Sequence, residues 1–139
     1  MRFRGRVYRD GKFWLAEVPV LDALTQGRSR KDSLLMIADW IESMVDRPRF
    51  KALVYPGRGE EFEVGSADTR GLVALLLQRQ RQMSGLSLAE AAQRLGVHSR
   101  NAYARYERGS SVPTLEKLHD LLRAVAPDQD FVLSESNIH

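Results

Sequence analysis

The second half of the chain consists of short helical segments separated by turns that contain glycine, and this punctuation constrains the fold more than any other feature. Apolar residues recur in this half at helical spacing. The pattern predicts helices over residues 69–83, 88–95, 100–108 and 115–126. Strand character is missing from this region, so we expect an all-α domain.

Polar residues and glycines define the ends of these helices. Ser87, followed three residues later by Glu90, forms a capping box ahead of the second helix. Gly96 is suited to the left-handed conformation that ends that helix. Ser99 can cap the third helix and Gly109 can close it. The result is two helices joined by a turn centred on one glycine.

Apolar side chains at helical spacing mark the inward side of this domain, and Val97 is expected to fill the core beneath the turn. The expected inward residues are Ala91, Ala92, Leu95, Tyr103, Tyr106, Leu115, Leu118, Leu121, Leu122 and Val125.

Two helices joined by a short turn at this spacing form a helix-turn-helix. This motif places its second helix against the major groove of DNA. Arginine suits guanine, asparagine suits adenine, and alanine suits the thymine methyl group. We expect base or groove contacts from Arg100, Asn101 and Arg105, and backbone contacts from flanking residues. The full set of candidate DNA-binding residues is Arg94, Ser99, Arg100, Asn101, Ala104, Arg105, Arg108, Ser110 and Ser111. The alternative is an arginine-rich helix face that is only solvated.

This segment resembles the phage-repressor (Cro/cI, or XRE) helix-turn-helix family. The matching stretches are Leu86–Ala92, Leu95–Val97, Tyr106–Gly109 and Val112–Leu118. Leu88 stands where the family commonly has glutamine. The resemblance implies a double-stranded DNA-binding domain.

The first 64 residues predict a different, α+β domain of order β-β-β-α-β. Asp10-Gly11 is a hairpin turn signal between two strands, and Pro19 should end the second strand. A short strand at 25–27 precedes a helix over 30–45. Ser29 and Asp32 resemble a capping box for that helix. Residues 50–55 predict a further strand, and 61–64 a possible returning one.

The composition of the chain excludes some kinds of site but does not indicate a function. Net charge is +3 and the chain has no cysteine, so it has neither disulfides nor a thiolate metal site. The histidines, His98, His119 and His139, lack metal-ligand spacing. The longest apolar run, 72–77, is too short to span a bilayer. We expect a cytoplasmic protein with no metal and no cofactor.

The carboxylates of the first domain do not form a catalytic cluster in the sequence. Asp10 belongs to the turn and Asp32 to the helix cap, while Glu17 lies on a strand and Asp22 in a loop. Paired carboxylates are what a Mg²⁺-dependent nuclease requires. We therefore expect no enzyme, although a Mg²⁺-dependent nuclease remains an alternative.

The chain as a whole resembles the HicB antitoxin family. The residues that carry this resemblance are Val7–Pro19, Thr25–Ser29, then Asp32, Leu34 and Ile37, and finally Ser99–Glu107. It implies a partial RNase H-like fold without nuclease activity, and a HicA-type toxin partner that cleaves mRNA. It also implies repression of the protein's own promoter, and a homodimer or higher homo-oligomer.

The resemblance does not mark the toxin-binding surface. Phe13 and Trp14 alternate along a strand, so we take them as candidate toxin-binding residues, with a core position as the alternative. A plain repressor with a ligand-binding or oligomerising first domain also remains open. The expected organisation is a toxin-binding domain at 1–64, a linker at 65–68, a DNA-binding domain at 69–126 and a tail at 127–139 whose end is mobile.

Overall fold

The computed structural model describes residues 1–139, and these divide into two compact units. Unit 1 comprises Met1–Thr69 together with Glu135–His139, and unit 2 comprises Arg70–Ser134. Each unit is described on its own below. The last five residues of the chain belong to unit 1 although unit 2 precedes them.

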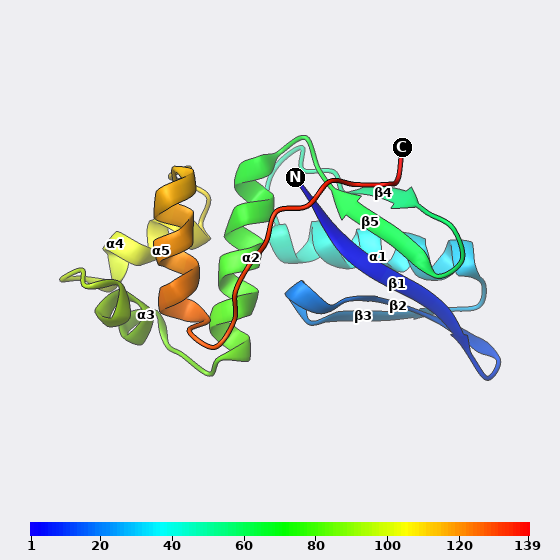
Figure 1. Ribbon diagram of the computed structural model, residues 1–139, viewed down its shortest axis with the longest axis horizontal. Coiled ribbons are helices and arrows are strands. Elements are labelled where there is room, and N and C mark those ends of the chain that lie inside the picture. Colours follow the sequence, from blue (N-terminus) through cyan, green and yellow to red (C-terminus); the bar gives the residue numbers. More distant parts are fainter. The chain divides into compact units, whose positions relative to one another are not determined.

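Unit 1 is a five-stranded sheet with one α-helix against it (Figure 1). The strand order is β3-β2-β1-β5-β4, and every neighbouring pair is antiparallel. The elements are β1 (Arg2–Asp10), β2 (Phe13–Val18), the 3-10 turn η1 (Pro19–Leu21), β3 (Ala23–Gly27), α1 (Arg30–Val45), β4 (Leu53–Pro56) and β5 (Glu61–Gly65).

One face of this sheet forms the core with α1. Val7 pairs with Ala16, and Ala16 pairs with Thr25, so the three side chains lie on the same face. Val7 and Ala16 are fully buried, and the Thr25 hydroxyl donates to the carbonyl of Ser33 in α1 at 3.1 Å. The packing of α1 on this face therefore explains why Val7, Ala16 and Val18 are buried on β1 and β2.

The hairpin between β1 and β2 is shifted by one residue from the expected turn. Asp10 pairs with Phe13, so the two loop residues are Gly11 and Lys12 rather than Asp10 and Gly11. Gly11 has a φ of 62°, whereas Lys12 has no positive φ. Glycine at the first central position is the pattern of a type II′ turn.

The helix α1 begins where the sequence predicts, but its cap is not fully reciprocal. The Ser29 hydroxyl accepts from the backbone N–H of Asp32 at 3.0 Å. The Asp32 carboxylate accepts from the N–H of Arg28 at 2.9 Å, not from that of the cap residue itself. Aspartate is one methylene shorter than the glutamate of a standard capping box.

The strand expected at 50–55 starts later, and β5 makes the sheet larger than the expected β-β-β-α-β order. Phe50 donates its N–H to the carbonyl of Arg47, and the N–H of Ala52 donates to the Glu42 carboxylate at 3.3 Å. These bonds hold residues 50–52 outside the ladder. The segment at 61–64 is a full strand, β5, which pairs with β1 in the middle of the sheet.

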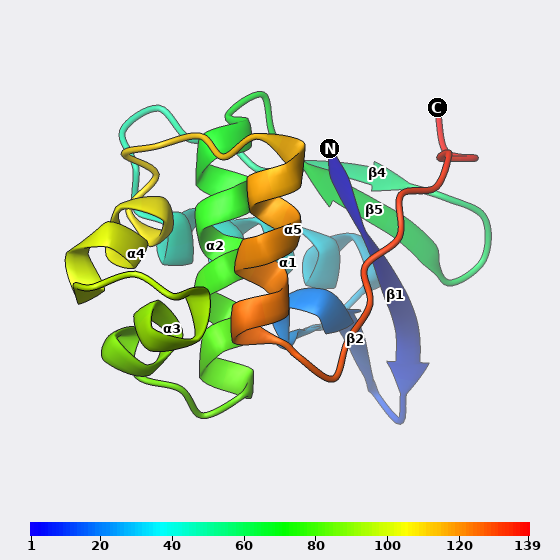
Figure 2. The same ribbon diagram turned by 60° about the vertical axis from the view of Figure 1, so that its left-hand side comes forward.

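Unit 2 contains four helices at the places that the sequence predicts (Figure 2). They are α2 (Thr69–Met83), α3 (Leu88–Leu95), α4 (Arg100–Glu107) and α5 (Leu115–Val125). Residues 71–77 of α2 are all buried. None of the chain's helices combines the length and apolarity that a membrane-spanning segment needs.

The inward side of unit 2 matches the sequence expectation except near the start of α5. Tyr103 and Tyr106 are buried, as are Leu121 and Val125. Leu115 is 70% exposed, so its assignment to the buried stripe is wrong. It is the first residue of α5 and lies one turn before the packed part of that helix begins.

Candidate nucleic-acid interface

The ends of α3 and α4 are fixed by local hydrogen bonds. Ser87 caps α3 through a complete capping box with Glu90, and the Ser99 hydroxyl accepts from the N–H of Ala102 in α4. Gly96 follows α3 with a φ of 84°, a conformation that side chains disfavour. The N–H of Val97 then donates to the carbonyl of Ala92, which completes a Schellman motif. These bonds set the angle at which the chain enters α4.

The helix α4 divides into a buried side and a charged exposed side. Tyr103 is fully buried and Tyr106 is 7% exposed. Arg100, Asn101 and Arg105 are all exposed. The structure therefore brings the three expected base-contacting residues onto one solvent-facing side of one helix, whose other side is anchored by aromatic rings.

Ala104 differs from the expectation. We expected it to point away from the core, toward a thymine methyl group, but it is only 6% exposed. It follows Tyr103 directly and lies at the edge of the packed side of α4. The expected orientation of Ala104 is therefore wrong, and its burial disfavours a contact with a base.

Arg105 rests on the neighbouring tyrosine. Its guanidinium donates to the Tyr106 hydroxyl at 3.2 Å and lies over that ring, 5.0 Å from the centroid. The side chain is exposed, and the contact with a tyrosine is of the modest strength typical of exposed cation–π pairs. Arg105 is thus pre-oriented along the helix surface while its guanidinium still has N–H groups available to a ligand.

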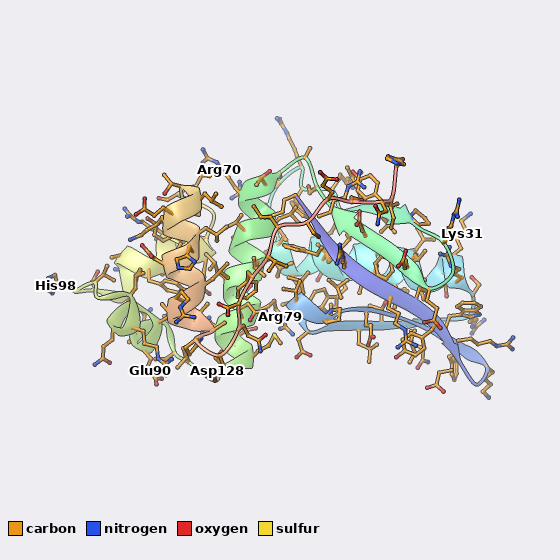
Figure 3. The ribbon with its side chains drawn as sticks, viewed as in Figure 1. Lys31, Arg70, Arg79, Glu90, His98 and Asp128 are labelled. Carbon is orange, nitrogen blue, oxygen red and sulfur yellow. The ribbon has the colours of Figure 1, made fainter.

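The remaining expected contacts flank α4. Arg108 and Ser110 are exposed just beyond its end, and Ser111 is half-buried. The N–H of Ser110 donates to the Arg105 carbonyl at 3.0 Å, so the turn after the helix is fixed to its last residues. Figure 3 shows His98 on the turn between α3 and α4, pointing away from unit 2.

A buried ion pair that the sequence does not indicate holds α4 in place. Arg81 of α2 donates to Glu107 of α4 through two nitrogens, at 2.7 and 3.0 Å. Only 13% and 8% of the two side chains are exposed. Arg81 also donates to the carbonyl of Leu86 at 2.8 Å. The pair joins the first helix of unit 2 to the last turn of α4.

Electrostatics within this pair favour the charged form of Arg81. The hydrogen bond from Arg81 to Glu107 raises the arginine pKa above its usual value, against the opposing effect of burial. Burial raises the pKa of the neighbouring Tyr103 hydroxyl, and the charge of Glu107 raises it further, so this group remains neutral. In the sequence, Glu107 belongs to two stretches that resemble known families, Tyr106–Gly109 and Ser99–Glu107, and neither stretch indicates its partner. The sequence signal that could have identified Glu107 is a glutamate at the end of the helix, on the side that the apolar pattern predicts to be buried.

Arg94 is grouped with residues other than those of α4. A shallow hollow on unit 2 is lined by Arg94 and Leu95 of α3 and by the polar side of α5. The α5 residues in it are Lys117, Asp120, Arg123 and Ala124. The structure therefore brings Arg94 together with two further cations that the sequence reading did not select.

The two candidate residues in unit 1 lie on opposite faces of β2. Trp14 is on the same face as Ala16 and is half-buried, whereas Phe13 is on the face opposite α1 and is 37% exposed. The chain contains no group of three or more histidine, aspartate or glutamate side chains placed to hold a metal ion.

Comparison with known proteins supports the reading of unit 2. Residues 72–130 match the protein-family model described as a helix-turn-helix domain. No curated protein matches the chain. The match begins in α2 and runs past the end of α5, so it covers the capped turn, α4 and the Arg81–Glu107 pair. Residues 72–130 are therefore similar to helix-turn-helix domains, and this similarity indicates a DNA-binding regulator.

Proposed function

We propose that this protein represses its own operon by binding operator DNA through α4, and that it is the antitoxin of a HicAB-type toxin–antitoxin system. The observation that carries the DNA-binding part is the exposed side of α4, with Arg100, Asn101 and Arg105 together. The antitoxin part rests on the residue pattern of the first domain.

The dimensions of α4 suit the major groove. The helix has eight residues. An α-helix with its side chains is about 10–12 Å in diameter, close to the major-groove width of about 12 Å. Asn101 and Arg100 are in its first turn, where side chains reach base edges most easily. Arg105, one turn further on, lies within reach of a guanine or of the phosphate backbone.

Residues around α4 supply the sequence-independent part of binding. Arg108 and Ser110 follow the helix, Ser99 precedes it, and half-buried Ser111 ends the loop. Contacts of this kind position a protein on the duplex without reading sequence. Arg94 is a further proposed phosphate contact, and it lines a hollow together with residues of α5.

Unit 1 is proposed to bind a HicA-type toxin that cleaves mRNA. The support is the stretch from Val7 to Pro19, followed by Thr25-Gln26-Gly27, in which strand, turn, aromatic strand and third strand follow the order typical of HicB proteins. Phe13 offers an exposed aromatic ring on the face opposite α1 and is the better of the two aromatic candidates.

We infer that unit 1 is a partial RNase H-like fold without nuclease activity. The Asp32 carboxylate is engaged with the N–H of Arg28, and Asp22 follows η1 with a left-handed backbone. Glu17 lies 4.0 Å from Arg6. These carboxylates are on separate elements with separate partners, which disfavours a shared Mg²⁺ ion.

The experiment that tests this proposal combines co-purification with a gel shift. A tagged copy of the protein is expressed with its neighbouring reading frame, and the DNA upstream of the pair is the probe. We expect a small basic protein to co-elute and the upstream DNA to shift. The co-eluting band must be absent when the neighbouring reading frame is left out of the expression. Neutralisation is checked separately, by whether co-expression of this protein relieves the growth arrest that the toxin causes.

The alternative outcomes separate the two halves of the proposal. A DNA shift without any partner would refute the antitoxin role and leave a plain repressor. A partner without a DNA shift would refute autorepression.

Toxin and operator binding are proposed to be coupled through the oligomer, since a two-fold operator is matched by a two-fold dimer. The operator is titrated with this protein at increasing toxin ratios. We expect the apparent affinity to change with the ratio. An affinity that is the same at every ratio would refute the coupling.

A further inference from the structure

Both ends of unit 2 are connected to unit 1. At one end, residues 66–68 join β5 to α2. At the other end, the chain leaves α5 and its last residues, Glu135–His139, pack within unit 1. Figures 1 and 2 both show this end of the chain (red) beside β4 and β5. Unit 2 is therefore inserted between two parts of unit 1, and two connections join the units.

The first connection is short and is fixed by contacts within unit 1. Asp68, the residue before α2, accepts from the guanidinium of Arg47 at 3.0 Å, and both side chains are mostly covered. The Ser66 hydroxyl accepts from the N–H of Asp68 at 3.1 Å. Arg47 follows the end of α1, so this connection is fixed to the helix of unit 1.

The second connection ends in a site on the sheet face opposite α1. The Ser136 hydroxyl donates to the Glu63 carboxylate, and Arg2 donates to the same carboxylate at 3.1 Å. Arg2 also donates to the carbonyl of Ile138 at 2.8 Å, and its guanidinium lies over the Tyr55 ring, 3.5 Å from the centroid. Only 8% of the Glu63 side chain is exposed, so the serine and the arginine satisfy a buried charge.

Gly57 gives the aliphatic side chain of this segment its place. A Cβ atom at residue 57 would lie 2.7 Å from Cδ1 of Ile138, closer than real side chains approach. Glu135–His139 form no helix or strand, so side chains and one carbonyl group hold the segment, not a ladder of backbone hydrogen bonds. A segment held in this way can open locally while the sheet beneath it stays folded.

The length of chain between α5 and this site limits how far unit 2 can move. Val125 ends α5 and Glu135 begins the docked segment, so residues 126–134 connect them. An extended chain spans at most roughly 3.3–3.6 Å per residue, which gives about 30 Å for this connection. While the segment is docked, the end of α5 stays within that distance of Glu135. Once the segment leaves its site, only residues 66–68 restrain unit 2.

We propose that Glu135–His139 is a releasable strap on the motion of unit 2. In the docked state, Glu63, Arg2 and Gly57 hold the strap, so both ends of unit 2 are restrained. In the released state, unit 2 moves on its first connection alone. The strap and its site belong to one chain, and docking needs neither DNA nor a partner protein. The inference therefore goes beyond the proposed function and does not depend on it.

Docking of the strap is tested first, with a single nitroxide label at His139→Cys in the full-length chain, which has no other cysteine. The releasing variant is Ser136→Asp with Ile138→Asp, which places new carboxylates against Glu63 and beside Gly57. We expect the label to be immobilised with the native strap and mobile in the releasing variant. A mobile label with the native strap would overturn docking, and an immobilised label in the releasing variant would overturn the assigned site.

The effect on unit 2 is tested with a pair of labels, at Lys31→Cys on α1 and His98→Cys between α3 and α4, two exposed residues (Figure 3). Double electron–electron resonance measures the distribution of distances between them. We expect one narrow peak with the native strap and loss of that peak, into a broad distribution, in the releasing variant. Equal widths with the native strap and in the releasing variant would overturn the strap.

The matched control is Val132→Asp with Leu133→Asp. It adds the same charge to the connecting segment, at side chains that are 84% and 86% exposed and lie outside the docked residues. We expect the control to keep the narrow peak and the immobilised label at residue 139. Broadening in the control as large as in the releasing variant would show that added charge, and not loss of docking, frees unit 2, and would overturn the inference. Because neither readout uses DNA, its failure is distinguishable from failure of operator binding.

Discussion

The arginines of β1 and those of α4 are used in opposite ways. On β1, Arg2 is bound by Glu63, and Arg6 is paired with Glu60 and lies 4.2 Å from the centroid of Tyr8. On α4, the only carboxylate is Glu107, and it is turned inward to Arg81. Arg2 and Arg6 of the strand are paired with neighbouring carboxylates, whereas the helix keeps its positive charge at the surface.

This difference shows that local placement, not total charge, identifies the DNA-binding surface. A net charge of +3 decides little in a chain of 139 residues. Because Glu107 faces inward, the exposed side of α4 carries no carboxylate, and the electrostatic potential there is more positive than the net charge of the chain suggests. The buried pair therefore serves both the position and the charge of α4.

The largest expected effect comes from breaking that pair. Glu107→Ala leaves Arg81 buried without its partner and should lower the free energy of unfolding by about 3–5 kcal/mol. The measurement is urea denaturation followed by circular dichroism. Glu60→Ala is the control, since both side chains of that pair are about half exposed and its loss should change the free energy of unfolding little.

The double variant Arg81→Met, Glu107→Leu sharpens the same comparison. It replaces the charges by apolar side chains and should recover most of the lost stability. A double variant as unstable as Glu107→Ala would mean that the charges themselves, rather than an unpaired buried group, stabilise the domain.

The next effect is on DNA affinity. Arg105→Ala should weaken operator binding by about 1–3 kcal/mol if the residue contacts a base, because a bidentate contact is lost. Anisotropy with labelled operator and with random DNA measures it. An equal loss on both sequences would make Arg105 a phosphate contact. Arg6→Ala, on β1, should change neither affinity.

Ala104 tests the boundary between the two sides of α4. Because it is buried, Ala104→Leu should overpack the core and cost about 1–3 kcal/mol of stability. Arg100→Leu, on the exposed side, should change stability by less than about 0.5 kcal/mol. Thermal unfolding compares them. An Ala104→Leu variant of full stability would return Ala104 to the exposed face and to the candidate contacts.

Much of unit 2 could be predicted from sequence because its signals are local. Ser87, Gly96 and Ser99 fix the ends of α3 and α4 through bonds between residues close in the chain. The Arg81–Glu107 pair could not be found in this way, since it joins residues 26 apart. The burial of Ala104 was missed for a related reason: helical spacing gives the centre of the buried side but not its width.

The sheet of unit 1 shows the same limit. Its hairpin turn was predicted to within one residue, whereas the central pairing of β5 with β1 depends on contacts across the chain. The docking of Ser136 on Glu63 joins residues 73 apart, and the polar sequence there indicated a mobile end instead. Local signals identify elements, and long-range contacts decide which of them meet.

The smallest expected effect concerns pH. Burial opposes the charged form of Glu63, but hydrogen bonds from Ser136 and Arg2 outweigh it and hold its pKa below the usual range. A depressed pKa stabilises the docked state above the unfolded value of about 4.3, and this contribution is lost as pH falls through the folded value. Docking, followed by the fluorescence of a label at residue 139, should therefore be constant near pH 7 and weaken only in acid. Glu63→Gln should remove the acid dependence; a midpoint near neutrality would contradict the assignment.

The most direct test of the central claim is a matched pair of variants titrated into labelled DNA from upstream of the reading frame. Arg100→Ala with Arg105→Ala removes two charges from α4, and Arg6→Ala with Arg9→Ala removes two from β1. We expect the α4 variant to lose at least about tenfold in affinity, the size of one good base contact, and the β1 variant to bind like wild type. Equal losses would show that total charge controls binding, and would contradict the assignment of the DNA-binding surface to α4.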